Sequence, residues 1–342
     1  MIDRQLVKKI LVIKLRAVGD VLLSTIVLKN LRLAFPDTEL DFLTEPPSDD
    51  IIRGNPNVNG LLIYDRSSMS GLGLIRLVRN RGYDLVIDLF GNPRTALVTR
   101  LSGARYRVGY KFRGRTYAYN ILVEPRGGEV HNTQFNLDAL ERIGVAIQDR
   151  NLYFPIASAD EEYVQGFLAE SQLTGRRLIA LNTGGGWYTK RWPIERFAKL
   201  ADRISETLNA TVVLTWGPGQ LEEVRQVAGM MQNSAFIPPP TTLPQLGALL
   251  KKCTVVISND SGPMHITAAV GVPVLGIFGP TNTKLQGPYG DRHMVIRNES
   301  VECLGCNLTT CPIKHPCMQE LSVETVYSAT VALLSKNQIS LS

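Results

Sequence analysis

Three glycine-containing loops in the C-terminal half of the chain have the composition of an anion-binding site. Each follows a short apolar run and precedes a segment with helical spacing: Thr183-Gly184-Gly185-Gly186, Trp216-Gly217-Pro218-Gly219 and Asn259-Asp260-Ser261-Gly262-Pro263. Glycine lets a ligand approach the backbone, and a helix start presents free N–H groups and the positive end of its dipole. Lys190, Arg191 and His265 follow these loops and could add donors. One such loop is usually only a turn, but three together predict a diphosphate-containing ligand.

Asp20 is the acidic residue at the carboxyl end of the first apolar run. A carboxylate there could act as a general base that takes a proton from a sugar hydroxyl. The alternative is a cap for the following helix, since Asp is a preferred cap residue worth about 1 kcal/mol. Asp88 also ends an apolar run, and we expect it to serve the Gly91-Asn92-Pro93 turn.

Several familiar signatures are absent from the sequence. There is no G-x-G-x-x-G after the first strand and no G-x-x-x-x-G-K-[ST], which argues against nicotinamide dehydrogenases and P-loop NTPases. No H-E-x-x-H occurs, and the three loops lack the acidic pair that would hold Mg²⁺ on a diphosphate. We therefore expect Lys190, His265 and helix ends to neutralise the ligand without a metal.

The elements that position these residues alternate between strand and helix patterns. Strands are expected over 9–15, 39–44, 60–64 and 84–89, and again over 178–182, 211–215, 255–258 and 274–278. The first strand is followed by helical spacing as far as Pro36. This alternation predicts an α/β fold with two doubly wound domains that face each other across a cleft, with sites at the carboxyl ends of the strands.

The expected domain boundaries are 1–157 for an N-terminal domain and 158–325 for a C-terminal domain. Residues 326–342 are expected to form a C-terminal helix and tail, with packing back on the N-terminal domain as one option. The length of 342 residues fits two domains, and a chain that is 44% hydrophobic and 20% charged is neither disordered nor a small disulfide scaffold. No apolar stretch reaches the roughly 18 residues of a membrane span, and the start lacks a signal peptide, so we expect a cytoplasmic protein.

The net charge of +6 lies entirely in the N-terminal half. Residues 1–155 carry 22 Lys and Arg against 16 Asp and Glu, whereas residues 156–342 carry 15 of each. A run without any acid contains Arg94, Arg100, Arg105, Arg107, Lys111, Arg113 and Arg115. Such a run suits a nucleic acid, a phosphorylated substrate or an acidic membrane surface; an ordinary solvated face is the alternative.

Four of the five cysteines cluster as Cys303, Cys306, Cys311 and Cys317, with His315 among them. The spacing could hold zinc or an iron–sulfur centre, and a reducing cytoplasm argues against disulfides. Because only the first pair has C-x-x-C spacing, we favour structural or unoccupied thiols over a metal site.

Four segments resemble the heptosyltransferases of glycosyltransferase family nine, which add heptose from ADP-heptose to the lipopolysaccharide inner core. They are ILVIKLRAVGDVLLSTIVLKNLRLAFPD, DLVIDLFGNPRTALVTRLSGARYRVGY, NTGGGWYTKRWP and ISNDSGPMHITAAVGVPVLGIFGPTN, and the last is the most specific. The opening segment is most similar to members that add the branch heptose, because of Lys14-Leu15-Arg16 before Gly19-Asp20.

The resemblance implies a GT-B architecture and metal-independent transfer with inversion, with the acceptor on the first domain and the nucleotide-sugar on the second. It implies that Asp20 is the catalytic base. The donor-binding residues that it implies are Thr183, Gly184, Lys190, Glu222, Asp260, Ser261, Gly262 and His265. Of these, the resemblance implies Glu222 as the ribose ligand, and the loop before it varies in length among family members.

An anionic inner-core acceptor would make the basic run a docking surface, with Arg94, Arg107, Lys111 and Arg113 as acceptor-binding candidates. The expected protein needs no cofactor, binds no nucleic acid and is peripheral at the inner face of the inner membrane. Two alternatives remain: a GT-B transferase or epimerase that uses another nucleotide-sugar, and a non-catalytic polyanion-binding protein.

Overall fold

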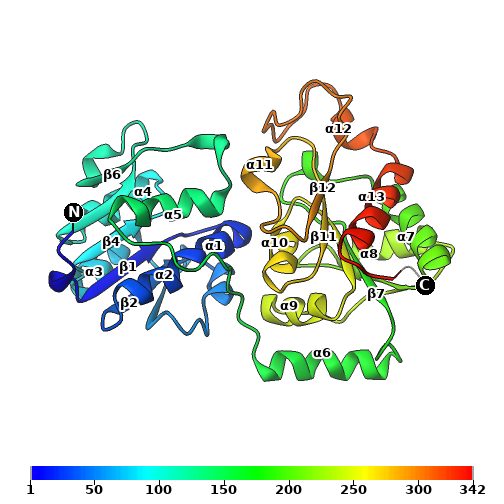
Figure 1. Cartoon of the computed structure of the whole chain (residues 1–342), viewed down its shortest axis with the longest axis horizontal. Helices are drawn as coiled ribbons and strands as arrows, with labels where there is room; N and C mark the ends of the chain where they lie inside the picture. Colours follow the sequence, from blue (N-terminus) through cyan, green and yellow to red (C-terminus); the bar gives the residue numbers. More distant parts are fainter. Residues whose placement is uncertain (1, 341–342) are drawn as a thin grey trace. The chain divides into compact units, whose positions relative to one another are not determined.

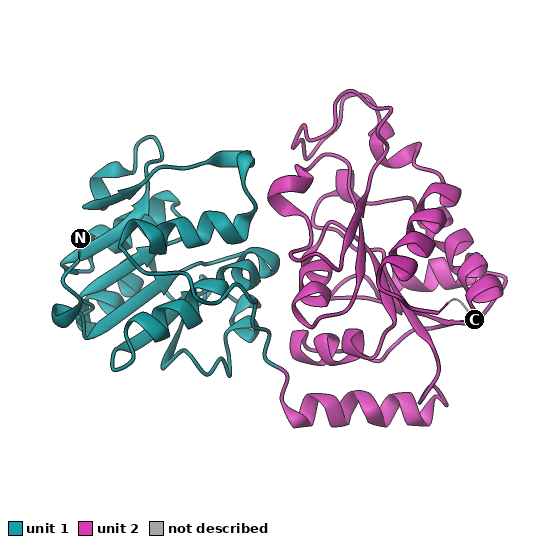
Figure 2. Ribbon diagram, in the orientation of Figure 1, with its two compact units in different colours: residues 1–155 teal, residues 156–342 magenta. Residues whose placement is uncertain are grey.

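A computed structural model describes residues 2–340, and the chain divides into two compact units, residues 1–155 and 156–342 (Figure 2). We call them unit 1 and unit 2. The sequence placed the boundary between residues 157 and 158, and the structure places it after Pro155. Each unit is built around its own parallel sheet.

Unit 1 has a six-stranded parallel sheet with the order β3-β2-β1-β4-β5-β6 (Figure 1). Its strands are β1 (Lys9–Ile13), β2 (Glu39–Thr44), β3 (Gly60–Ile63), β4 (Leu85–Asp88), β5 (Tyr106–Tyr110) and β6 (Ile121–Val123). Ile13 is in register with Asp88, so β1 and β4 end at the same edge. The strand order reverses between these two strands, which is where doubly wound sheets bind their ligands.

Helices cover both faces of this sheet, as its continuous apolar strands require. On one face α5 (Asn132–Arg142) packs on α1 (Val18–Ser24) and α2 (Ile26–Ala34); on the other, α3 (Gly71–Arg81) lies beside α4 (Pro93–Leu101). Short 3₁₀ turns are η1 (Arg4–Leu6), η2 (Ser48–Ile51), η3 (Thr116–Ala118) and η4 (Gly127–Glu129). The helical spacing up to Pro36 is divided between α1 and α2 at Thr25, whose hydroxyl donates to Leu22 O (2.8 Å).

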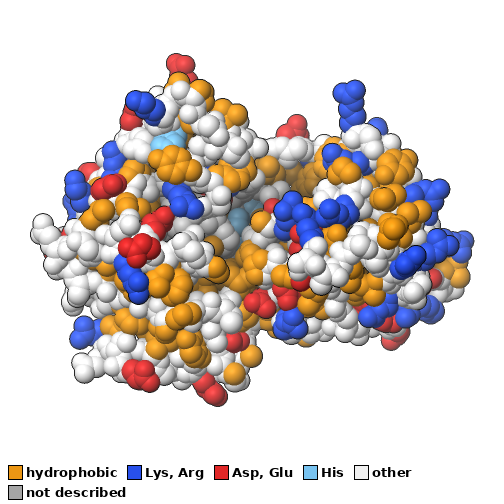
Figure 3. Space-filling view, turned by 180° about the vertical axis from the view of Figure 1, so that it is seen from behind, with side chains coloured by type: hydrophobic (Ala, Val, Ile, Leu, Met, Phe, Trp, Pro, Cys, Tyr) orange, Lys and Arg blue, Asp and Glu red, His pale blue; other side chains and the backbone are white. Residues whose placement is uncertain are grey.

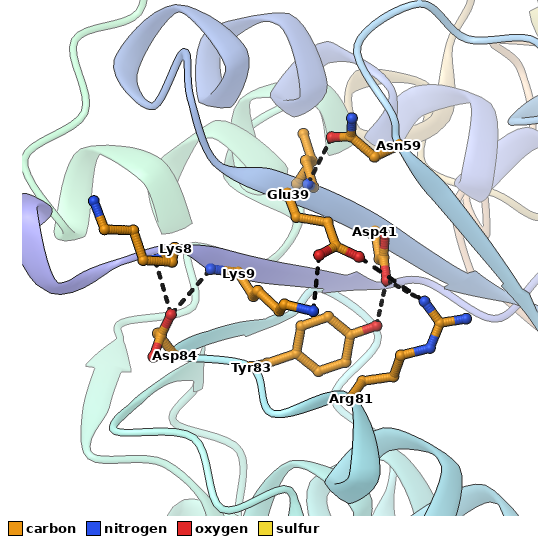
Figure 4. A network of polar contacts seen from close by, with 9 residues as sticks. Lys8, Lys9, Glu39, Asp41, Asn59, Arg81, Tyr83 and Asp84 are labelled. Atoms are coloured by element: carbon orange, nitrogen blue, oxygen red, sulfur yellow. Dashed lines mark hydrogen bonds and ion pairs between the residues drawn. The ribbon is translucent and has the colours of Figure 1, made fainter.

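A polar network closes the amino edge of this sheet (Figure 4). Asp41, fully buried in β2, accepts from Tyr83 Oη (2.6 Å) and lies 3.5 Å from an Arg81 nitrogen. Lys9 and Glu39, the first residues of β1 and β2, form an ion pair at 2.8 Å. Burial raises the pKa of Tyr83, and its hydrogen bond to Asp41 raises it further. These charges lie at the edge opposite Asp20, so the network serves the fold.

We expect Gly60→Ala to destabilise unit 1, because a Cβ at residue 60 would lie 2.3 Å from Asp41 Oδ1. The Asp41 carboxylate cannot move away without weakening its bond from Tyr83. Overpacking of this kind costs about 1–3 kcal/mol of the free energy of unfolding, measurable by urea denaturation. Gly71→Ala is the matched control, since a Cβ there meets no atom within 4 Å. Equal stability of the two variants would contradict this account.

Unit 2 has a second parallel sheet, with the order β12-β11-β10-β7-β8-β9. Its strands are β7 (Leu178–Asn182), β8 (Thr211–Thr215), β9 (Ala235–Phe236), β10 (Val255–Asn259), β11 (Val274–Ile277) and β12 (Met294–Ile296). Its helices are α6 (Ser158–Glu170), α7 (Ile194–Leu208), α8 (Leu221–Met230), α9 (Leu243–Lys251), α10 (Gly262–Ala269), α11 (Thr283–Gln286), α12 (Pro316–Gln319) and α13 (Val323–Lys336), with the 3₁₀ turn η5 (Tyr188–Lys190). On one face, α7, α8 and α13 share a core with the strands.

The C-terminal helix packs within unit 2. α13 lies against α7, β11 and β12, and its buried residues Val326, Leu333 and Leu334 belong to the core of that unit. The sequence predicted a helix and tail over residues 326–342, and the observed helix is Val323–Lys336. Packing of this segment on the N-terminal domain stays a prediction. Among residues 2–340, no helix has the length and apolar character needed to cross a membrane.

Candidate functional site

The three glycine-containing loops lie at one edge of the sheet of unit 2. They follow β7, β8 and β10, which are neighbours in the order β10-β7-β8. Parallel strands bring their carboxyl ends to the same edge, so residues 183–186, 216–219 and 259–262 lie next to one another. This edge is the candidate site of unit 2.

Two asparagine side chains hold these loops together. Asn259 Nδ2 donates to Thr183 O (2.6 Å), and its Oδ1 accepts from Trp192 N (3.1 Å). Asn182 Nδ2 donates to Ser261 Oγ (2.8 Å). Both asparagines are buried, so the loops after β7 and β10 are fixed to each other. Asn182 was not predicted as a site residue; its position as the last residue of a buried strand was the available signal.

Lys190 is paired with an acidic side chain at this edge. Its Nζ lies 2.7 Å from Asp260 Oδ2 and 4.5 Å from the centre of the Trp187 ring. Asp260 also accepts from Thr281 Oγ1 (2.6 Å). The Lys190 and Asp260 side chains are only 14% and 5% exposed. The pair therefore fixes a cation immediately before the start of α10, where free N–H groups favour an anion.

A second contact fixes the loop that follows β7. Thr183 Oγ1 donates to Glu223 Oε1 (2.8 Å), and Arg191 Nη1 lies 3.0 Å from Glu223 Oε2. Arg191 Nε donates to Gly185 O (3.0 Å). The sequence did not predict Glu223, because nothing local shows which residue of α8 reaches a loop 40 residues earlier.

Gly184 lies against the side chain of Gln220. A Cβ at this position would lie 2.5 Å from Gln220 Nε2, and Gln220 Oε1 accepts from Gly217 N (2.9 Å). Gln220 precedes α8 and so connects the loops after β7 and β8. Glycine at residue 184 leaves space for this side chain.

The other predicted ligands of unit 2 differ in exposure. Ser261 is the N-cap of α10, Gly262 is its first residue, and His265 follows one turn later, nearly buried. The Glu222 side chain is 74% exposed, and its Oε2 lies 3.9 Å from Arg225 Nη1. The structure thus gathers Ser261, Gly262 and His265 at the site, whereas Glu222 faces solvent from the first turn of α8.

Asp20 lies in the first turn of α1, at the carboxyl edge of the sheet of unit 1. Its Oδ2 accepts from Ala17 N (3.4 Å), so it helps to cap the helix while its side chain stays partly exposed. The cap role and a role as a base are therefore compatible, since one carboxylate oxygen suffices for the cap.

Lys14 is a neighbour of Asp20 that the sequence did not single out as a site residue. Its Nζ donates to Leu89 O (3.1 Å). Burial lowers the pKa of Lys14, while the charges of Asp20 and Asp88 raise it. Lys14 thus places a buried amino group at the edge where Asp20 lies.

Asp88 serves the turn after β4, as expected. Its Oδ1 accepts from Phe90 N (3.0 Å) and Gly91 N (2.9 Å), and its Oδ2 accepts from Tyr119 Oη (2.8 Å). Burial raises the pKa of this carboxyl group, and these hydrogen bonds oppose that effect.

The four acceptor-binding candidates are in different environments. Arg94 lies over the Tyr64 ring, 5.3 Å from its centre; Lys111 pairs with Glu124 at 2.7 Å; Arg113 is exposed. Arg107 differs, because its Nε donates to Ala118 O (3.1 Å) and its Nη1 to Ala104 O (2.6 Å). Burial lowers the pKa of its guanidinium. This placement favours a structural role for Arg107 over the predicted binding role.

The cysteine cluster lies between β12 and α13. Cys303 and Cys306 are exposed, Cys317 is buried, and all are free thiols. Burial and the charges of the other three cysteines raise the pKa of Cys317 to about 11. Within residues 2–340, no group of three or more His, Cys, Asp or Glu side chains is arranged to hold a metal ion.

Comparison with known proteins gives concordant matches. A model of glycosyltransferase family 9 (heptosyltransferase) matches residues 72–316. Lipopolysaccharide heptosyltransferase 3 of Escherichia coli is 28% identical over 295 residues, 80% of this chain and 84% of that protein. The crystal structure of a family 9 glycosyl transferase from Veillonella parvula is 28% identical, with a TM-score of 0.85 over 96% of this chain and 97% of that one. For E. coli ADP-heptose LPS heptosyltransferase II the identity is 22% and the TM-score 0.77, over 96% and 99% of the two chains.

Proposed function

This chain belongs to glycosyltransferase family 9 (heptosyltransferase), and from that premise we propose that it transfers heptose from ADP-heptose to the lipopolysaccharide inner core. It is a glycosyltransferase, and its two doubly wound sheets are those of the GT-B architecture predicted from the sequence. ADP-heptose and lipopolysaccharide occur in the names of similar proteins.

The donor diphosphate would bind at the candidate site of unit 2. Lys190, held near Asp260, and the N–H groups at the start of α10 together offer positive charge to an anion. His265 in the first turns of α10 adds a further donor. Thr183 and Gly184 belong to the loop that Glu223 and Asn259 hold in place.

The reaction that we propose is a single displacement at the anomeric carbon. A hydroxyl oxygen of the acceptor forms the new bond to this carbon as its bond to the diphosphate oxygen breaks, and ADP leaves with the electron pair. Asp20 takes the hydroxyl proton, while Lys190, His265 and helix N–H groups stabilise the charge on ADP. Attack opposite to the leaving group inverts the configuration, and no metal or other cofactor has a role.

The buried Lys190–Asp260 pair beside the start of α10 is the observation that carries this proposal. The test is mass spectrometry of a heptose-deficient inner-core acceptor incubated with the protein and ADP-heptose. We expect a gain of one heptose with ADP-heptose and none with UDP- or GDP-sugars. No gain with ADP-heptose would refute the proposal, and a gain with another nucleotide-sugar would correct the donor.

We propose that the enzyme acts as a peripheral protein at the cytoplasmic face of the inner membrane, where an inner-core acceptor would be anchored. Arg94, Lys111 and Arg113 remain candidates for contact with the anionic groups of that acceptor. Their positions near the carboxyl ends of β4 and β5 place them on the same edge of unit 1 as Asp20.

We expect the cysteine cluster to be free of metal. Protein purified without oxygen and chelators should contain less than about a tenth of an equivalent of zinc or iron, because only one cysteine pair has ligand spacing. Elemental analysis by plasma mass spectrometry gives the value, and a Cys303→Ser/Cys306→Ser variant is the control. A stoichiometric metal in the wild type that this variant lacks would establish a metal site.

A further inference from the structure

The outward side of α3 carries arginine and leucine together. Leu72, Arg76 and Arg79 are spaced i, i+4 and i+7, which places them along one side of the helix, and all three are exposed. Leu74 and Val78, on the opposite side, are fully buried in the core of unit 1. Leu72 is 69% exposed, so this large apolar side chain has no cover within unit 1.

The neighbouring helix repeats this pattern. In α4, Leu97, Arg100 and Leu101 are exposed, while Val98 is buried in the core that also receives α3. Because α3 and α4 pack side by side on the same face of the sheet, their outward sides form one surface. We call it the Arg–Leu face, and it consists of Leu72, Arg76, Arg79, Leu97, Arg100 and Leu101.

The Arg–Leu face has no acidic residue to compensate its charge. Residues 66–83 and 89–123, which contain both helices, include no Asp or Glu. Arg76, Arg79 and Arg100 take part in no ion pair with another residue of the range 2–340. In the view from behind (Figure 3), Lys and Arg side chains lie among hydrophobic ones over unit 1. Such a surface attracts an anionic partner and also offers it apolar contact.

We propose that the Arg–Leu face binds the surface of an anionic lipid bilayer. Leucines on two adjacent helices can enter the interface between headgroups and acyl chains, while arginines at the same depth contact phosphates. Nucleic-acid surfaces instead combine basic residues with exposed aromatic rings on which bases stack. The apolar residues of this face are all leucine, so charge and chemistry favour lipid.

The position of the face fits the edge of unit 1 that holds Asp20. α3 and α4 follow β3 and β4, so their first turns begin at the carboxyl edge of the sheet. A bilayer against the Arg–Leu face would therefore lie beside that edge. Binding of a bilayer by the Arg–Leu face can be tested without the proposed function. Its biological role rests on the proposed function, because a lipid-anchored acceptor would have to reach Asp20 from that bilayer.

The test is sedimentation of the full chain with vesicles of phosphatidylcholine containing about 30% phosphatidylglycerol. The charge variant is Arg76→Gln/Arg79→Gln/Arg100→Gln, and the apolar variant is Leu72→Ser/Leu97→Ser. The matched control removes three exposed cations of unit 2: Arg176→Gln/Lys199→Gln/Lys252→Gln. Transfer to a delipidated, water-soluble acceptor is measured for every variant.

We expect the wild type and the control to bind these vesicles and to leave pure phosphatidylcholine unbound. The partition coefficient should fall about tenfold or more in the charge variant and also fall in the apolar variant. The inference would be overturned if the wild type did not bind the anionic vesicles, or if the control lost as much vesicle binding as the charge variant. Binding of RNA by the wild type without binding of vesicles would also overturn it. Transfer to the water-soluble acceptor should be the same in the wild type and in all variants. If the wild type showed no such transfer, the result would count against the proposed function and not against the Arg–Leu face.

Discussion

Asp20→Asn should lose heptose transfer by about a hundredfold or more while it keeps the fold and the affinity for ADP. Asparagine matches aspartate in shape and can still accept from Ala17 N, so the start of α1 is retained. It cannot accept the proton of the attacking hydroxyl. The measurements are kcat with ADP-heptose and an inner-core acceptor, the calorimetric Kd for ADP, and urea unfolding.

Asp160→Asn is the matched control. Asp160 holds the same position in α6 as Asp20 in α1: its Oδ2 accepts from Ala157 N (2.9 Å) at the start of the helix. If Asp20 served only as a helix cap, Asp20→Asn and Asp160→Asn should behave alike. Both variants would then show small changes in stability and no change in kcat. Normal turnover in Asp20→Asn would remove Asp20 from the mechanism.

Lys190→Met should impair both transfer and stability. Loss of the ammonium leaves the buried Asp260 carboxylate without its cation, although it still accepts from Thr281 Oγ1. Breaking one side of a buried ion pair costs about 3–5 kcal/mol. The leaving diphosphate also loses a cation, so kcat should fall by about a hundredfold or more. Thermal unfolding and steady-state kinetics give the two effects separately.

The double variant Lys190→Met/Asp260→Asn separates the two roles. An asparagine at position 260 is neutral and does not need the Lys190 cation. The double variant should therefore recover much of the stability that Lys190→Met loses. Transfer should stay low, because the Lys190 cation is still missing from the site that stabilises ADP. If transfer recovered together with stability, Lys190 would serve only to neutralise Asp260.

Local patterns in the sequence predicted the parts of the site that are continuous in the chain. The strand, loop and helix patterns around residues 183–186, 216–219 and 259–262 gave the glycine-containing loops, and adjacent parallel strands do bring them to one edge. Asp20 and Asp88 were likewise placed at strand ends. Such predictions succeed because apolar periodicity and glycine positions act over a few residues.

Partners distant in the chain could not be predicted in this way. Lys190 and Asp260 were both predicted as donor-binding residues, and only the structure shows that they pair across 70 residues of chain. The resemblance implied Glu222 as the ribose ligand and said nothing of its neighbour Glu223, which contacts Thr183, because the rotation of α8 on the sheet selects the residue that reaches this loop.

Sequence patterns thus established two α/β domains, the glycine-containing loops at the strand ends and the basic character of the first half. The tertiary structure decided which basic residues are available. Arg107 from the predicted basic run donates to backbone carbonyls inside unit 1, while Arg76 and Arg79, outside that run, join Arg100 on an open face. Net charge depends only on composition, but the availability of a charge depends on the hydrogen-bond acceptors that packing places around it.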